Sequence, residues 1–236
     1  MTFFEPPEPQ PLPAEHRQPD WLGPASNILG VAVPLRILLA RNDQVALAIT
    51  DATAFPNGVE FSVVLRVRSF SAEARRSLTH GSPFHFDRFA GDPPTKEIPP
   101  ELIRFGVQFA DGRKATNLDN RHWHSEADPP GPVLSLRGGG GGDRAWDMRF
   151  WLWPLPPAGP LAFVAEWPLG GIALTRIEVD ADPFLQAAAQ AEPLWPEGEP
   201  SSGSSWGASQ VVTSSQVVTS SGPDSAPDAP PEGEQP

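Results

Sequence analysis

The residues best suited to chemistry lie in one short segment, His122-Trp123-His124-Ser125-Glu126. In an extended segment side chains alternate in direction, so His122, His124 and Glu126 project to the same side. Two imidazoles and a carboxylate on one face can hold Fe, Mn or Zn with open coordination positions. The spacing therefore predicts a candidate metal site. The surrounding residues are polar or proline, so a solvated loop without metal is the alternative interpretation.

The His-x-His pattern at His122 and His124 resembles the start of a cupin motif, and cupins are also β-sandwich proteins. The resemblance implies a metal-dependent enzyme in which Glu126 completes the ligand set. Two features depart from the cupin pattern. Glu126 follows the second histidine sooner than in cupins, and no downstream histidine completes the set. Apart from this metal ion, we predict no cofactor.

A second group of candidate residues is aromatic. Trp151 and Trp153 fall in the opposite phase to the core-facing residues of their strand, together with Arg149. Outward aromatic rings stack on sugars or anchor a partner protein, so these three residues and Trp123 are the candidate binding residues. The alternative is that the N-terminal arm or a C-terminal helix covers the two tryptophans. We favour this alternative, because monomers rarely leave large apolar patches bare.

Two further features, a run of glycines and one carboxylate, could take part in chemistry. The five glycines Gly138–Gly142 are not a phosphate loop, because Asp143-Arg144 follows them instead of the Lys-Ser/Thr pair that binds phosphate. They are predicted to end a short strand, Val133–Arg137, as a flexible hairpin connection. Asp51 falls at an inward phase in its strand, which predicts either a buried carboxylate with a partner or exposure at a strand end.

The elements that position these residues are predicted to be strands. Residues 59–67 alternate most clearly, with Val59, Phe61, Val63, Leu65 and Val67 on one face. About nine such short segments follow one another with turns between them, which predicts an all-β protein, an antiparallel β-sandwich of Ig-like or jelly-roll-like type. Pro34 predicts that the first strand, residues 31–39, lies at a sheet edge. A short C-terminal helix is predicted to begin at Asp182 as N-cap.

Charge and composition divide the 236 residues into three parts. The net charge of −12 is concentrated at the ends, while residues 21–196 carry nineteen acids and sixteen bases. We therefore expect a proline-rich arm (1–24), one sandwich domain (25–192) and an acidic tail (193–236), with both termini disordered. The tail holds a direct repeat, Ser-Gln-Val-Val-Thr-Ser, at 209–214 and 215–220. Either each copy adds as a strand to the sheet edge of a partner protein, or the repeat is a short tandem duplication without function.

These properties exclude some partners. A nearly neutral domain lacks the basic surface that binds nucleic acid, and no apolar run is long enough to cross a membrane. With no signal peptide recognised, we expect a cytoplasmic protein.

Two stretches, residues 105–117 and 151–163, resemble uncharacterised proteins of GC-rich actinobacteria. The resemblance covers about residues 20–190 and implies a bacterial cytoplasmic setting, without functional residues. The leading hypothesis from the sequence is a non-catalytic protein-interaction module, because no strong catalytic motif is present. The alternatives are a small-molecule or carbohydrate binder that uses the aromatic face, and the cupin-like metal-dependent enzyme.

Overall fold

The computed structural model describes residues 19–69, 82–84, 97–119, 129–142 and 144–195. The chain divides into two units, residues 1–203 and 204–236, and all described residues belong to the first. The predictions for residues 1–18 and 196–236, the repeat included, lie outside the described residues. So do the predictions for His122, Trp123, His124 and Glu126.

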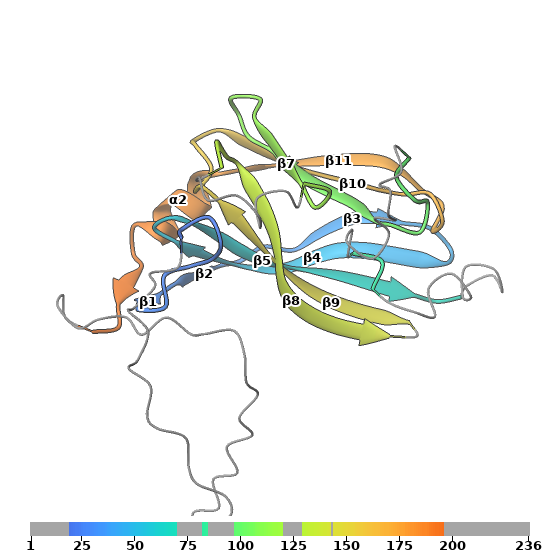
Figure 1. Ribbon diagram of the computed structural model, residues 1–236, viewed down its shortest axis with the longest axis horizontal. Coiled ribbons are helices and arrows are strands. Elements are labelled where there is room, and N and C mark those ends of the chain that lie inside the picture. The colour runs from blue at the N-terminus through green and yellow to red at the C-terminus, as the bar shows by residue number, and fades with distance from the viewer. Residues whose placement is uncertain (1–18, 70–81, 85–96, 120–128, 143, 196–236) are drawn as a thin grey trace, which may run out of the picture. The chain divides into compact units, whose positions relative to one another are not determined.

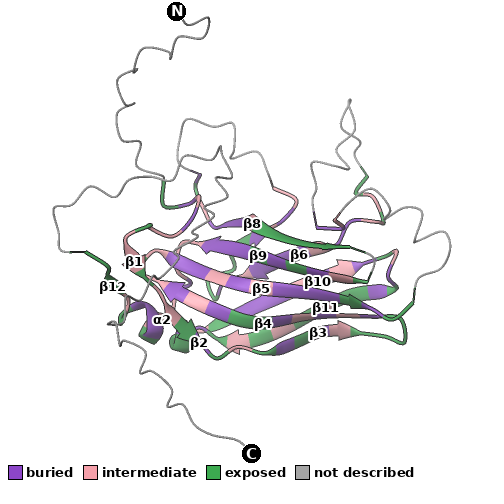
Figure 2. Ribbon diagram, turned by 90° about the horizontal axis from the view of Figure 1, so that it is seen from below, coloured by how far each residue is buried: buried purple, intermediate pink, exposed green. Residues whose placement is uncertain are grey.

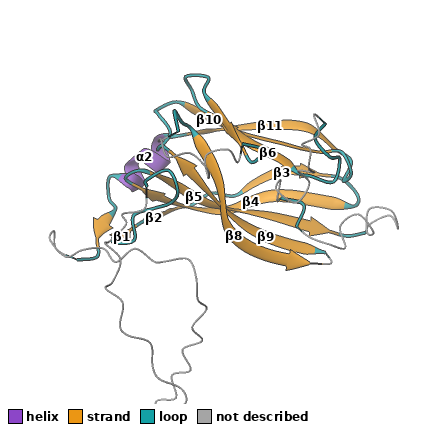
Figure 3. Cartoon of the chain, viewed as in Figure 1, coloured by secondary structure: helices purple, strands orange, loops and turns teal. Residues whose placement is uncertain are grey.

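The described residues form an antiparallel β-sandwich, as the sequence predicts (Figures 1 and 3). The larger sheet has six strands: β2 (Val31–Val33), β3 (Ile37–Arg41), β4 (Val45–Phe55), β5 (Gly58–Val67), β9 (Ala145–Trp153) and β8 (Val133–Gly142). The smaller has four: β11 (Ile172–Asp180), β10 (Pro160–Trp167), β6 (Arg104–Gln108) and β7 (Lys114–Thr116). A short pair, β1 (Ile28–Leu29) and β12 (Glu192–Pro193), lies apart from both sheets. Every pairing is antiparallel.

Alternating apolar residues on the facing sides of the two sheets make the core. Phe61 and Phe150 from the larger sheet meet Phe105 and Phe163 from the smaller one, and all four are at most 1% exposed. The ring centroids of Phe105 and Phe150 lie 5.1 Å apart, and those of Phe61 and Phe163 lie 5.5 Å apart. These edge-to-face and tilted contacts join the sheets at their centres.

The sheet edge near Pro34 and the C-terminal helix lie where the sequence predicts them. Two details of the prediction are wrong. Pro34 falls between β2 and β3, which both pair with β4 at the edge, so the predicted single strand is two. Helix α2 (Asp182–Ala188) packs against β2 and β4 and buries Phe184 at one end of the sandwich. Its N-cap is Ala181, not Asp182, and the Asp180 carboxylate accepts a hydrogen bond from the Asp182 N–H at 3.0 Å.

The conformation of the glycine run, residues 138–142, differs most clearly from the sequence prediction. Gly138–Gly142 do not end the strand, because they continue β8 and pair with Ala145–Arg149 of β9. Gly139 has a φ of +133°, and a Cβ at this position would lie 2.2 Å from the carbonyl oxygen of Asp147. A Cβ at Gly141 would lie 2.3 Å from the carbonyl oxygen of Ala145. The two backbones approach too closely for side chains, so glycine is required for pairing and not for flexibility.

This contact predicts a difference between two neighbouring glycines. Gly139→Ala should lower the free energy of unfolding by at least about 2 kcal/mol, because it combines an unfavourable φ with a backbone clash. Gly140→Ala should change it by less than about 0.5 kcal/mol, because a Cβ there meets nothing within 4 Å. Urea unfolding of both variants measures the difference. Equal effects would contradict the assigned pairing of β8 with β9.

Candidate functional site

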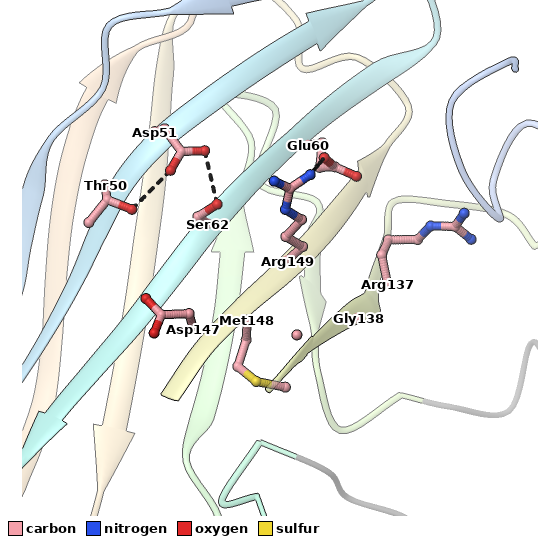
Figure 4. A pocket seen from close by; sticks show the side chains of 10 residues that line it. Thr50, Asp51, Glu60, Ser62, Arg137, Gly138, Asp147, Met148 and Arg149 are labelled. Carbon is pink, nitrogen blue, oxygen red and sulfur yellow. Dashed lines mark hydrogen bonds and ion pairs between the residues drawn. The ribbon is translucent and has the colours of Figure 1, made fainter. Parts of the chain in front are cut away.

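The candidate site is a polar groove on the outer face of the six-stranded sheet (Figure 4). Its cavity has a volume of about 400 Å³, within the range of ligand sites. Strands β4, β5, β9 and β8 supply its lining: Thr50, Asp51, Glu60, Ser62, Arg137, Gly138, Gly139, Asp147, Met148 and Arg149. Because the residues come from adjacent strands of one sheet, the hydrogen-bonded ladder holds their positions.

A bulge in β4 directs Asp51 into this groove. Val45, Leu47 and Ile49 face the core, but the pairing with β5 shifts between Ile49 and Asp51. The extra residue reverses the phase, so Asp51 is exposed and Ala52 is buried. The interpretation of Asp51 as an inward carboxylate is therefore wrong, and a bulge, not a strand end, is the reason for its exposure.

Hydroxyl groups hold the Asp51 carboxylate. Ser62 Oγ donates a hydrogen bond to Oδ1 at 2.9 Å, and Thr50 Oγ1 donates one to Oδ2 at 3.0 Å. Ser62 lies opposite Asp51 in the ladder, so the cross-strand pair fixes this contact. Its hydrogen-bonding partners here are neutral, so its negative charge is available at this end of the groove.

Two ion pairs lie beside Asp51. Arg149 Nη1 is 3.2 Å from Glu60 Oε1, and Arg66 Nη2 is 2.6 Å from Asp147 Oδ1. The side chains of Arg149 and Asp147 are 65% and 60% exposed. Pairs this exposed contribute at most about 1 kcal/mol to stability. Their exposed faces are free to meet charges on a bound molecule.

Arg137 links the groove to the segment before β1. Its Nη1 donates a hydrogen bond to the carbonyl oxygen of Leu22 at 2.5 Å. Burial holds the pKa of the Arg137 guanidinium below its usual value, and the Glu60 carboxylate offsets only part of this decrease. An arginine stays protonated throughout the physiological range, so Arg137 adds a positive charge at the rim.

The groove is hollow because β8 has glycine, and no side chain, at Gly138 and Gly140 on this face. Gly138 lies opposite Arg149 and Gly140 lies opposite Asp147, and a Cβ at either glycine would meet nothing within 4 Å. Any larger side chain at these two positions would project beside the ion pairs. The composition of β8 therefore produces the open side of the groove.

The structure separates the residues of the predicted aromatic face. Trp151 is 0% exposed, and its indole Nε1–H donates to the carbonyl oxygen of Asp20 at 3.1 Å. Residues 19–22 cover it, and Trp21 in this segment is only 7% exposed. The arm predicted for residues 1–24 thus includes packed residues from Trp21 onward, and Trp151 is not an exposed stacking surface. Trp153 is half-buried.

Of the predicted binding residues, Arg149 is the one that lies in the groove. Among the described residues, no group of three or more His, Cys, Asp or Glu side chains is arranged to hold a metal ion. The predicted ligands His122, His124 and Glu126 lie outside that part of the chain, as does Trp123, so the metal site stays a prediction.

Sequence reasoning missed the groove as a unit. The sequence predicts Arg149 as a binding residue and Asp51 as either a buried carboxylate or one exposed at a strand end, but it does not place the two in one site. The sequence does not predict the strand conformation of Gly138–Gly142. This conformation places backbone without side chains beside Asp147 and Arg149. The glycine run itself was the available signal, since a Gly in a strand marks a close backbone approach.

A second hollow, of about 340 Å³, lies on the outer face of the four-stranded sheet. The Arg104–Glu166 ion pair, at 2.6 Å, stands at its side, and Leu174 is 71% exposed. It is less polar than the groove and has fewer charged groups.

Comparison of the chain with protein-family models, with curated proteins and with solved structures finds no match. The resemblance to actinobacterial proteins therefore stays a prediction. Among the described residues, no helix is long and apolar enough to cross a membrane.

The burial of Trp151 predicts how its substitution changes the free energy of unfolding. Trp151→Ala should lower the free energy of unfolding by about 3–5 kcal/mol, because a fully buried indole is removed. Trp151→Phe should cost less, since it keeps most of the ring and loses the hydrogen bond to Asp20. Trp195→Ala is the control, because Trp195 is 52% exposed. Unfolding of Trp151→Ala at the same urea concentration as wild type would contradict the packing.

Proposed function

We propose that the chain is a non-catalytic protein-interaction module, and that the groove on the six-stranded sheet is its binding surface. The observation that carries the proposal is the open side of the groove, where β8 presents exposed backbone next to exposed charged side chains. A partner protein finds both main-chain hydrogen-bonding groups and charges there. These are the two contacts that fix an extended segment in place.

The charge pattern favours a protein partner. Carboxylates of Asp51, Glu60 and Asp147 lie in the groove with the guanidinium groups of Arg137 and Arg149. A surface with both signs matches another polypeptide of mixed charge, whereas a nucleic acid requires a predominantly basic one. Such complementarity contributes to specificity and to the rate of association.

The rigidity of the site is a further support. Groove residues lie on strands of a packed sandwich, and the core-facing side chains of β4, β5 and β9 are buried. A site on a rigid sheet loses little conformational entropy on binding. The carbohydrate-binding alternative requires exposed tryptophans, and the burial of Trp151 removes one of the candidate stacking residues. As part of this proposal, we expect the protein to act in the cytoplasm.

Capture experiments with the full-length chain as bait test the function. We expect wild type to retain at least one protein from a lysate of its source cells. Gly140→Lys and Arg149→Glu should retain at least about fivefold less, because each alters the open side of the groove. Arg176→Glu is the matched control, since Arg176 is an exposed, ion-paired arginine on the other sheet.

Urea unfolding of each variant verifies that it is folded. The proposal is supported if the two groove variants lose capture while wild type and Arg176→Glu retain it. If every captured protein is retained equally by all four chains, or if none is captured, the groove is not an interaction surface.

A further inference from the structure

The free edge of β8 is a distinct feature of the six-stranded sheet. In the part of the chain that the structure describes, β9 is the only strand paired with β8, and Gly138–Gly142 are exposed (Figure 2). An edge strand has a row of backbone N–H and C=O groups without ladder partners. Proteins usually protect such an edge with lysine, proline or inward-pointing charges. Residues 138–142 contain none of these.

We infer that β8 receives an extended segment of a partner protein as an added antiparallel strand, and that this segment has the pattern basic–apolar–acidic. This inference rests on the proposed function and specifies how the groove binds. The evidence for it is the free edge, the cavity beside it, and the order of charges along β9.

The distance across the glycines suits side-chain contact between β9 and the added strand. Neighbouring strands lie about 4.8 Å apart, so the added strand would lie about 10 Å from β9. At Gly138 and Gly140 no side chain stands between them, because a Cβ at either glycine would meet nothing within 4 Å. An arginine on one side and a glutamate on the other can together span this distance.

The register of β8 with β9 sets the order of charges. A residue opposite Gly138 faces Arg149 and is expected to be acidic, while a residue opposite Gly140 faces Asp147 and is expected to be basic. An antiparallel segment meets Gly140 first, so the basic residue comes first. The residue between them lies on the other face, the side of the buried Met148, and is expected to be apolar. Antiparallel pairing is chosen because every strand pair of this sheet is antiparallel.

A second copy of the chain fits this edge poorly. If the glycine segments of two copies paired, each edge would meet another strand without side chains. Arg149 and Asp147 would then face no opposite charge across the new ladder. The charges of β9 therefore favour a different polypeptide, with long charged side chains of its own.

Synthetic peptides and the full-length protein test the inference. The probe is a capped heptapeptide, Thr-Thr-Lys-Val-Glu-Thr-Thr, and its control has Lys and Glu exchanged. In an NMR titration of the ¹⁵N-labelled chain we expect the probe to bind about fivefold more tightly than the control. The largest shift changes should fall on the amides of Gly138–Gly142.

A charge exchange in the protein gives the decisive comparison. Asp147→Lys combined with Arg149→Glu should reverse the preference between the two peptides. Arg176→Glu combined with Glu178→Arg, on the other sheet, should leave the preference unchanged. Equal affinities, a preference for the exchanged peptide on wild type, shifts centred outside β8, or no binding would each overturn strand addition. If the peptides fail while capture still depends on the groove, strand addition is wrong and the proposed function stands.

Discussion

The close approach of the β8 and β9 backbones is the constraint on which the binding surface depends. At Gly139 and Gly141 a Cβ would lie 2.2 and 2.3 Å from carbonyl oxygens of β9, so no other residue fits without displacement of the strands. Because the inward positions must be glycine and the outward positions are also glycine, this half of β8 has no side chains on either face. An ordered strand of this composition is unusual, since glycine in a strand loses conformational entropy without packing in return.

The groove follows from that strand together with the bulge in β4. The bulge turns Asp51 outward, where Ser62 and Thr50 donate hydrogen bonds to it, and the glycines leave the other side open. Between them lie exposed ion pairs that contribute little to stability. The residues that stabilise the fold are elsewhere, in the aromatic core between the sheets and beneath the segment that covers Trp151. Binding and stability therefore depend on largely separate sets of residues.

The alternation of apolar residues predicts most of the fold. Residues 59–67 form β5, Pro34 marks an edge, and a short helix closes one end, because period-two burial and proline chemistry act locally. The missed features depend on contacts distant in sequence. The bulge at Thr50 and the pairing of Gly138–Gly142 need a partner strand to define them, and the cover over Trp151 comes from residues about 130 positions earlier. Of the groove, Arg149 alone was predicted as a site residue, since a groove is a property of several strands together.

Amide hydrogen exchange of Gly138–Gly142 tests the central claim most directly. In the free protein, the amides that point to β9 should be protected and those that point to the free edge should exchange rapidly, which gives an alternating pattern. Saturation with a captured partner should then protect the second group. If all five amides of the free protein exchange at the rate of an unstructured chain, the glycines are a flexible connection and the account of the groove is wrong.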